Sequence, residues 1–129
     1  MVCLKTFKGR PIVPGDVEGE AIVLDSISFY GDVDPEKGVL YDGRTIVNKI
    51  LVARKSRGST VGSYVIYSLK LHGKAPKAIL LGRSEPIVIA GAVLAGIPLY
   101  NGLPEDFFKI VSDGAKIKVR RDGFIILDL

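Results

Sequence analysis

The amino-acid sequence predicts a mixed α/β fold with barrel-like sheets and flanking helices. Short apolar runs rich in Val and Ile recur along the chain, and stretches of helical periodicity lie between them. The 15 glycines indicate short elements joined by tight turns, and 47% apolar with 25% charged residues is typical of a folded globular chain. We therefore expect residues 1–129 to form a single domain.

The amino-terminal third is predicted to contain two strands and a long connection. Residues 2–7, VCLKTF, alternate apolar and polar side chains and indicate a first strand. Residues 18–29, EGEAIVLDSISF, indicate a second strand that follows a turn at Pro14-Gly15. Residues 30–45 are polar and contain three glycines and a proline, so we expect a long excursion of the kind that is often functional or interfacial.

The centre of the chain is predicted to be a strand followed by a helix. Residues 45–53, TIVNKILVA, are β-branched and apolar, which indicates a strand entering the core. From Thr60 the apolar residues recur at a spacing of four, and a glycine and a proline (residues 73 and 76) then supply a stop. We expect a helix of about three turns whose inward-facing residues are Val61, Val65 and Leu69.

The remaining elements follow from composition and turn signals. Short apolar runs predict strands at residues 77–82 and 98–102, and a helix is predicted at residues 103–114. Residues 85–98, EPIVIAGAVLAGIP, could form a small-residue helix or another buried strand, and we favour a helix over residues 87–95. The last 15 residues, 115–129, are predicted to form a hairpin that turns at Asp122-Gly123.

Composition excludes several classes of protein. No apolar run approaches the ~20 residues that cross a bilayer, and the amino terminus lacks a signal-peptide pattern, so we expect a soluble cytoplasmic protein. Cys3 and His72 are the one cysteine and the one histidine, too few for a zinc or iron–sulfur site. We expect no metal on this chain, and any metal must belong to a partner.

The charge distribution does not favour a nucleic-acid protein. The formal charge is +4, but the cations are dispersed except for Arg54, Lys55 and Arg57. The sequence shows no nucleic-acid module and no aromatic residues interleaved with the cations.

Arg57 belongs to the most informative segment of the chain, residues 56–63, which reads SRGSTVGS, and Arg54 and Lys55 directly precede it. Its simplest interpretation is structural, because Ser59 just before a helix would cap a free backbone N–H and stabilise the helix by ~1 kcal/mol. However, a cap needs one hydroxyl, and this segment contains four, at residues 56, 59, 60 and 63. Gly58 and Gly62 would also let another molecule approach the backbone closely.

A site for an anion explains more of this segment. A helix start carries about +0.5 of a charge and unpaired N–H donors, and the neighbouring cations add to its attraction for carboxylate or phosphate. Ser59 and Ser63, four residues apart, would share one side of the helix with Tyr67. The glycine spacing matches neither a dinucleotide fingerprint nor a P-loop. His72 is some three turns from Ser59, so a serine–histidine–acid triad is disfavoured and a helix-end role is expected for His72.

Three stretches of the chain resemble one enzyme family. They read EGEAIVLDSISFYGDVDPEKGVL (residues 18–40), SRGSTVGSYVIYSLKLHGKAPKAIL (residues 56–80) and IVIAGAVLAGIPLY (residues 87–100). In this order they resemble the small subunit of phosphomevalonate dehydratase, a hydro-lyase of the aconitase X type. The resemblance extends over nearly the whole chain and is strongest in GSTVGS, residues 58–63.

The resemblance implies a swivelling β/β/α domain that closes over a large subunit carrying a [4Fe–4S] iron–sulfur cluster. It implies the loss of water from mevalonate 5-phosphate to give trans-anhydromevalonate 5-phosphate, a step of an archaeal isoprenoid route. In aconitase-like enzymes a serine of the swivel domain takes the proton from carbon, and Ser59 matches that serine. The candidates for substrate contact are Arg57, Gly58, Thr60 and Ser63.

Other interpretations remain open on the sequence. The substrate could be another small hydroxy acid such as hydroxyproline. A non-catalytic binding or scaffolding subunit would use Ser59 only as a helix cap and the cations only to dock a partner. A phosphohistidine carrier is disfavoured, because no histidine lies between Gly31 and Leu71.

Overall fold

The computed structural model describes residues 3–57 and 61–129. In chain order the elements are β1 (Leu4–Lys8), β2 (Arg10–Val13), β3 (Val17–Ile27), α1 (Phe29–Asp32), β4 (Val33–Asp34), β5 (Val39–Leu40), β6 (Ile50–Ser56), α2 (Gly62–Leu71), β7 (Ala78–Arg83), α3 (Pro86–Ala95), β8 (Leu99–Asn101), α4 (Glu105–Ile110), β9 (Lys116–Val119) and β10 (Phe124–Asp128).

Eight strands are joined in the order β1-β10-β9-β3-β6-β7-β8-β2. The long strand β3 pairs antiparallel with β9 through residues 17–20 and parallel with β6 through residues 21–27. It therefore passes from a layer that contains β1, β10 and β9 to a second layer that contains β6, β7, β8 and β2. β1 and β2 end the order, yet only Gly9 separates them in the chain, and its N–H donates to the Gly123 carbonyl at 2.8 Å. The sheet therefore nearly closes on itself, which confirms the predicted barrel-like sheets.

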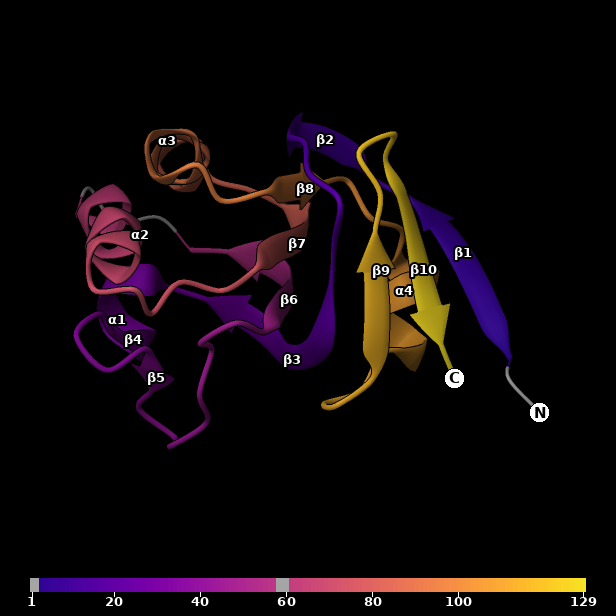
Figure 1. Ribbon diagram of the computed structural model, residues 1–129, viewed down its shortest axis with the longest axis horizontal. Coiled ribbons are helices and arrows are strands. Elements are labelled where there is room, and N and C mark those ends of the chain that lie inside the picture. The colour runs from indigo at the N-terminus through magenta and orange to yellow at the C-terminus, as the bar shows by residue number, and fades with distance from the viewer. Residues whose placement is uncertain (1–2, 58–60) are drawn as a thin grey trace.

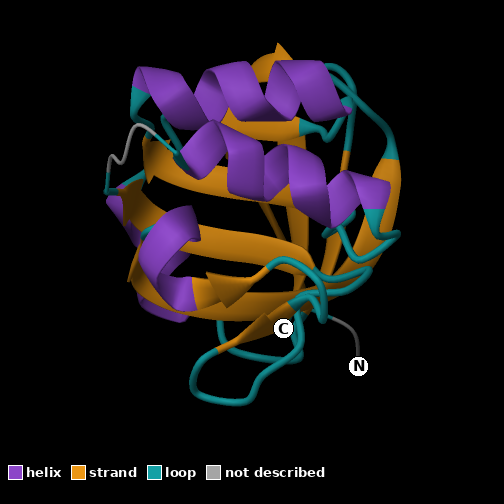
Figure 2. Cartoon of the chain, turned by 90° about the vertical axis from the view of Figure 1, so that its left-hand side faces the viewer, coloured by secondary structure: helices purple, strands orange, loops and turns teal. Residues whose placement is uncertain are grey.

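The helices α1, α2 and α3 form a third layer on one face of the parallel strands (Figure 1). α2 connects β6 to β7 and α3 connects β7 to β8, and these pairs are neighbouring parallel strands. Because such crossovers are right-handed and progress in one direction, both helices lie on the same face. Figure 2 shows this helical layer in front of the strands.

The side chains of the central strands point alternately to the two faces of the sheet and contribute to two hydrophobic cores. Side chains of successive strand residues point to opposite faces. Those of β6 and β7 that pack beneath the helices are Leu51, Ala53, Ile79 and Leu81. Those that pack between the two sheets, with Phe107 and Phe108 of α4, are Ile50, Val52, Ala78 and Leu80. Burial on both faces explains why these strands read as continuous apolar runs.

Several predicted elements are confirmed, and others need correction. The strands near residues 77–82 and 98–102, the helix at 87–95 and the terminal hairpin are present, while the helix expected at 103–114 is shortened to α4. β2 was not predicted, because it is short and contains Pro11, which cannot donate a ladder hydrogen bond; its pairing with β8 is irregular after Pro11.

The expected excursion at residues 30–45 contains regular structure. It begins in α1 and continues as the β4–β5 hairpin, with Phe29, Val33 and Leu40 buried in the core. The strand expected at residues 45–53 starts only at Ile50, since Asn48 has a left-handed backbone with φ 57°.

The inward face of α2 differs from the prediction. Val61 is 37% exposed, whereas Gly62, Ile66 and Leu69 are buried. The expectation that Val61 packs inward is therefore wrong, while Val65 is half-buried and Leu69 is buried as expected. The face that carries Ile66 lies against α3, where a Cβ added at Gly91 would come within 3.0 Å of Ile66 Cδ1.

None of the helices in residues 3–57 and 61–129 combines the length and apolar character needed to span a membrane.

Candidate active site

The candidate site lies at one edge of the sheet, where four parallel strands end together. β3, β6, β7 and β8 are mutually parallel neighbours, and their carboxyl ends are Ile27, Ser56, Arg83 and Asn101. Ligands of α/β sheets commonly bind outside the carboxyl ends of such strands. The segment singled out in the sequence, residues 56–63, leaves the end of β6 at this edge.

The buried side chain of Ser56 links the end of β6 to the start of α3. It is 5% exposed, and its Oγ accepts a hydrogen bond from the Glu85 backbone N–H at 2.8 Å. Glu85 immediately precedes α3. This buried serine therefore fixes the start of α3 against the end of β6, a structural use of one of the four hydroxyls in the segment.

Arg57 points from the end of β6 toward α1. Its backbone N–H donates to the Ile27 carbonyl at 2.7 Å, which continues the pairing of β3 with β6. Its side chain donates from Nε to Ser26 Oγ at 3.2 Å and from Nη2 to Asp32 Oδ2 at 3.0 Å. These three side chains line a hollow of about 260 Å³ at the surface.

Arg54 faces a different part of the molecule. Its guanidinium forms ion pairs with Glu105 at 2.8 Å and Asp25 at 3.1 Å, and these bonds raise its pKa, with Glu105 the larger cause. Glu105 begins α4, which lies away from α1. The structure therefore does not gather Arg54 with Arg57, although the two were grouped in the sequence, and Lys55 between them is exposed.

The remaining candidate residues fall at or beside the start of α2. Gly58, Ser59 and Thr60 lie outside the described residues. Ser63 is half-buried in the first turn of α2, on the side that α3 approaches. The N-cap position of α2 is Val61.

His72 lies at the far end of α2, as expected of a helix-end residue. It is the C-cap, and its Nδ1 lies 2.8 Å from the Ser68 carbonyl oxygen. Arg57 precedes the opposite end of this ten-residue helix, so His72 does not share the candidate site.

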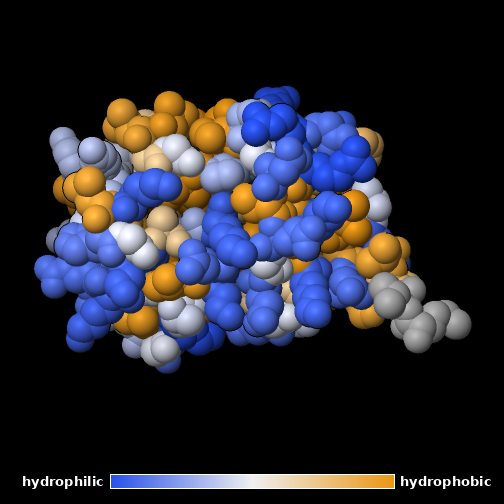
Figure 3. Space-filling model, viewed as in Figure 1, coloured by the Kyte–Doolittle hydropathy of each residue, from blue (hydrophilic) through white to orange (hydrophobic). Residues whose placement is uncertain are grey.

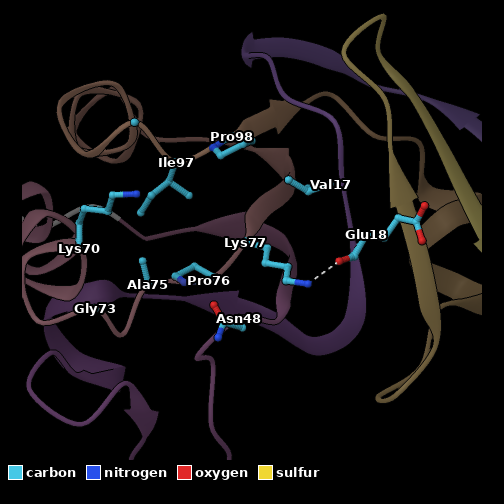
Figure 4. Close-up of a pocket in the computed structure, with 11 residues that line it drawn as sticks. Val17, Glu18, Asn48, Lys70, Gly73, Ala75, Pro76, Lys77, Ile97 and Pro98 are labelled. Carbon is cyan, nitrogen blue, oxygen red and sulfur yellow. Dashed lines mark hydrogen bonds between the residues drawn. The ribbon is translucent and has the colours of Figure 1, made fainter.

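A larger pocket of about 490 Å³ lies at the opposite edge, by the amino ends of the same strands (Figure 4). There Lys77 Nζ donates to the Glu18 carbonyl at 2.8 Å, and Lys70, Gly73 and Gly96 come from the carboxyl ends of α2 and α3. This pocket contains none of the residues predicted for the site. A hollow of about 630 Å³ between β3, β9 and β10 also contains none of them, so cavity size does not single out the candidate site.

The structure adds residues that the sequence interpretation missed. Ser26 and Asp32 bind the Arg57 side chain, and Ser28 caps α1 by accepting from the Gly31 N–H at 3.3 Å. Serine is a favoured N-cap residue, so Ser28 was a possible signal for the start of a helical turn.

The described residues do not gather three or more His, Cys, Asp or Glu side chains in a way that could hold a metal ion. Cys3 is a free, exposed thiol at the amino-terminal end of the described chain. Thiolate ligation of an iron–sulfur cluster takes several cysteines, so the described residues do not fit such a group.

Comparison with known proteins identifies close relatives. The family model described as the aconitase X swivel domain matches residues 6–127. The phosphomevalonate dehydratase small subunit of Aeropyrum pernix is 59% identical over 119 residues, which span 92% of this chain and 90% of the relative. The phosphomevalonate dehydratase small subunit of Thermococcus onnurineus is 48% identical over 127 residues, spanning 93% and 95%.

Solved structures agree with this relationship. The crystal structure of Thermococcus kodakaraensis aconitase X in its holo-form superposes with a TM-score of 0.88 at 44% identity, covering 95% of this chain and 98% of that chain. A relative solved by NMR in solution has a TM-score of 0.85 at 40% identity, covering 94% and 97%.

Proposed function

Because this chain belongs to the aconitase X swivel-domain family, we propose that it is the small subunit of a two-subunit hydro-lyase that dehydrates mevalonate 5-phosphate to trans-anhydromevalonate 5-phosphate. The observation that carries the proposal is the 59% identity to a phosphomevalonate dehydratase small subunit over 92% of this chain. The swivel fold, with two sheet layers and a helical layer, is the fold of the family.

In this proposal Ser59 is the base that removes the proton from the carbon next to the substrate carboxylate. The C–H electron pair forms the new double bond, the proton passes to the serine oxygen, and hydroxide leaves toward the large subunit. A serine needs stabilisation of its alkoxide to act as a base. The start of α2 supports this role, because it is a ten-residue helix with no acidic residue in its first turn.

The substrate carries a carboxylate and a phosphate, and we propose that Arg57, Gly58, Thr60 and Ser63 contact it. Arg57 is the described cation nearest the start of α2 in sequence, and its side chain is 55% exposed, which leaves it accessible. Ser63 lies in the first turn of the same helix. Both therefore flank the short segment that contains the proposed base.

We assign the iron–sulfur cluster expected for this family to the large subunit, since the described residues offer no ligand set. When bound there, such a cluster would supply a Lewis acid for the departing hydroxyl.

The outer surface of the helical layer supports the existence of a partner. α2 exposes Tyr64 and Leu71 at 74% and 71%, and α3 exposes Leu94 at 72%. α3 contains no charged residue, and apolar side chains gather over it in Figure 3. Helices that are apolar all round are normally covered, so this surface suits contact with a second polypeptide.

The test is an anaerobic assay of the complex between this chain and the proposed large subunit, a cysteine-bearing chain that we expect to co-purify with it. Wild-type complex should remove water from mevalonate 5-phosphate, and Ser59→Ala should abolish turnover while the complex still forms. Near wild-type turnover by Ser59→Ala would refute the base assignment. Turnover of a different hydroxy acid only would keep the mechanism and change the substrate.

A further inference from the structure

The short helix α1 is built around one carboxylate, that of Asp32. Ser28 caps the helix, and the Asp32 backbone N–H donates to the Ser28 carbonyl at 2.8 Å. Phe29 anchors the turn in the core at 1% exposure. The Asp32 carboxylate is itself tied down, because its Oδ2 accepts from the Ser28 backbone N–H at 2.8 Å. The acid is therefore held by the turn that contains it.

The same Oδ2 atom accepts from Arg57 Nη2 at 3.0 Å. The Asp32 side chain is 34% exposed and the Arg57 side chain is 55% exposed, so the acid is the more enclosed partner. Ser26 Oγ accepts from Arg57 Nε at 3.2 Å, which fixes a second corner of the guanidinium. Two contacts on different nitrogens define both the position and the plane of the group.

A stabilising role alone does not account for this arrangement. Exposed ion pairs contribute little to folding, commonly ~0–1 kcal/mol. The guanidinium has five N–H groups, and these two bonds use one from each of two nitrogens. Among the described residues these are the two side-chain hydrogen bonds of Arg57, which leaves three N–H groups for an anion at the edge where β6 ends. A long arginine side chain without such anchors would sample many rotamers and lose binding free energy on being ordered.

We propose that Asp32 is a positioning residue, which holds the Arg57 guanidinium in the orientation that receives the anionic substrate. Asp32 does not touch the substrate and acts through Arg57. This inference rests on the proposed function for its catalytic consequence, while the geometric part concerns the chain alone.

The first experiment measures the order of the Arg57 side chain without any substrate. A relative has been solved by NMR in solution, and the same method suits this chain labelled with ¹⁵N. The heteronuclear NOE of Arg57 Nε–Hε should be that of an ordered group in the wild type and should fall in Asp32→Ala. Asp32→Asn, which keeps an oxygen acceptor, should lie between the two.

The matched control is Asp42→Asn. Asp42 lines the same hollow, but its carboxylate pairs with Arg44 at 2.8 Å. The control should leave the Arg57 signal unchanged. An Arg57 NOE that is equally high in Asp32→Ala and in the wild type would overturn the proposal.

The second experiment is a double-mutant cycle in the two-subunit enzyme. Asp32→Ala should lower kcat/KM on the order of 10-fold, chiefly through KM, because misplaced contacts cost affinity and rate. In the Arg57→Ala background, Asp32→Ala should change kcat/KM less than about twofold, because the guanidinium through which Asp32 acts is absent. An equal effect in both backgrounds would show a merely structural role and overturn the proposal.

The two proposals fail separately. If Ser59→Ala is inactive but Asp32→Ala has wild-type kinetics, the proposed function stands and this inference falls. If the wild-type complex does not act on mevalonate 5-phosphate, the proposed function falls, and the NMR result still decides whether Asp32 orders Arg57.

Discussion

Gly91 of α3 packs tightly against the first turn of α2, and Gly91→Ala tests this contact. A Cβ atom at residue 91 would lie 2.9 Å from Ser63 Cα and 3.0 Å from Ile66 Cδ1. The first of these atoms belongs to the backbone of α2, in the turn where the proposed substrate contact Ser63 stands. An added methyl group must therefore push the two helices apart.

Two opposing terms set the size of the effect. Alanine is favoured over glycine inside a helix by about 1 kcal/mol. Overpacking a tight contact costs typically about 1–3 kcal/mol, and a clash with backbone cannot be relieved by a change of rotamer. We take the upper part of that range, so the net loss in the free energy of unfolding is about 1–2 kcal/mol. For a chain of this size the melting temperature should fall by roughly 3–8 °C.

The measurement is reversible unfolding by urea and by heat, followed by circular dichroism. Ala90→Gly is the matched control, because Ala90 is the exposed neighbour in the same helix. It should lose about 1 kcal/mol from helix propensity alone and keep its activity in the complex. Gly91→Ala should also lower kcat/KM, because the start of α2 moves. A Gly91→Ala variant as stable as the wild type or more stable would refute the close approach.

Three further changes test other parts of the structure. Tyr100→Phe should cost about 1–3 kcal/mol in urea unfolding, because the buried hydroxyl accepts from the Gly15 N–H at 3.1 Å and has its one proton to donate to the Arg120 or the Gly15 carbonyl oxygen, at 2.7 and 3.0 Å. Burial raises the pKa of Tyr100 above its ordinary value near 10, so wild-type stability should fall as the pH rises through that value, and the variant should lack this component. Asp113→Ala should lose about 1–2 kcal/mol in the same assay, since its carboxylate accepts from the Val23 N–H at 2.7 Å and pairs with Arg44 at 2.9 Å; no loss would show that water replaces both bonds. Arg57→Lys should lose nearly as much kcat/KM as Arg57→Ala, because lysine keeps the charge without the fork of donors; near wild-type kinetics would show that charge suffices.

Local signals in the sequence were sufficient for much of the fold. Pro86 in the first turn of α3 and Gly96 at its C-cap, with φ 68°, mark the two ends of a helix that was expected at residues 87–95. Gly123, with φ 103°, occupies the predicted hairpin turn between β9 and β10. In each case the information lies within a few residues of the feature that it determines.

Features that depend on distant partners were not predictable in this way. β2 exists because β8 pairs with it, and its own four residues include a proline. The inward face of α2 depends on Gly91, which lies 28 positions after Ser63 in the chain and permits α3 to approach. Arg57 was identified from its neighbours in sequence, but its partner Asp32 is 25 residues away. A single sequence contains no signal that joins such a pair.

The pairing of Arg57 with Asp32 changes how the site is expected to attract an anion. An arginine beside a carboxylate forms a pair that is nearly neutral in sum, so its field is weak beyond the Debye length of ~8 Å. Arg57 can still orient a bound anion, because its N–H groups are held in a fixed plane. The start of α2 has no acidic residue in its first turn, so its partial positive charge is not neutralised from within the helix. The start of α2 thus supplies the positive potential that attracts the anion, and Arg57 supplies the fixed hydrogen-bond donors that orient it. The four residues between Arg57 and Gly62 connect these two elements, and the proposed base is one of them.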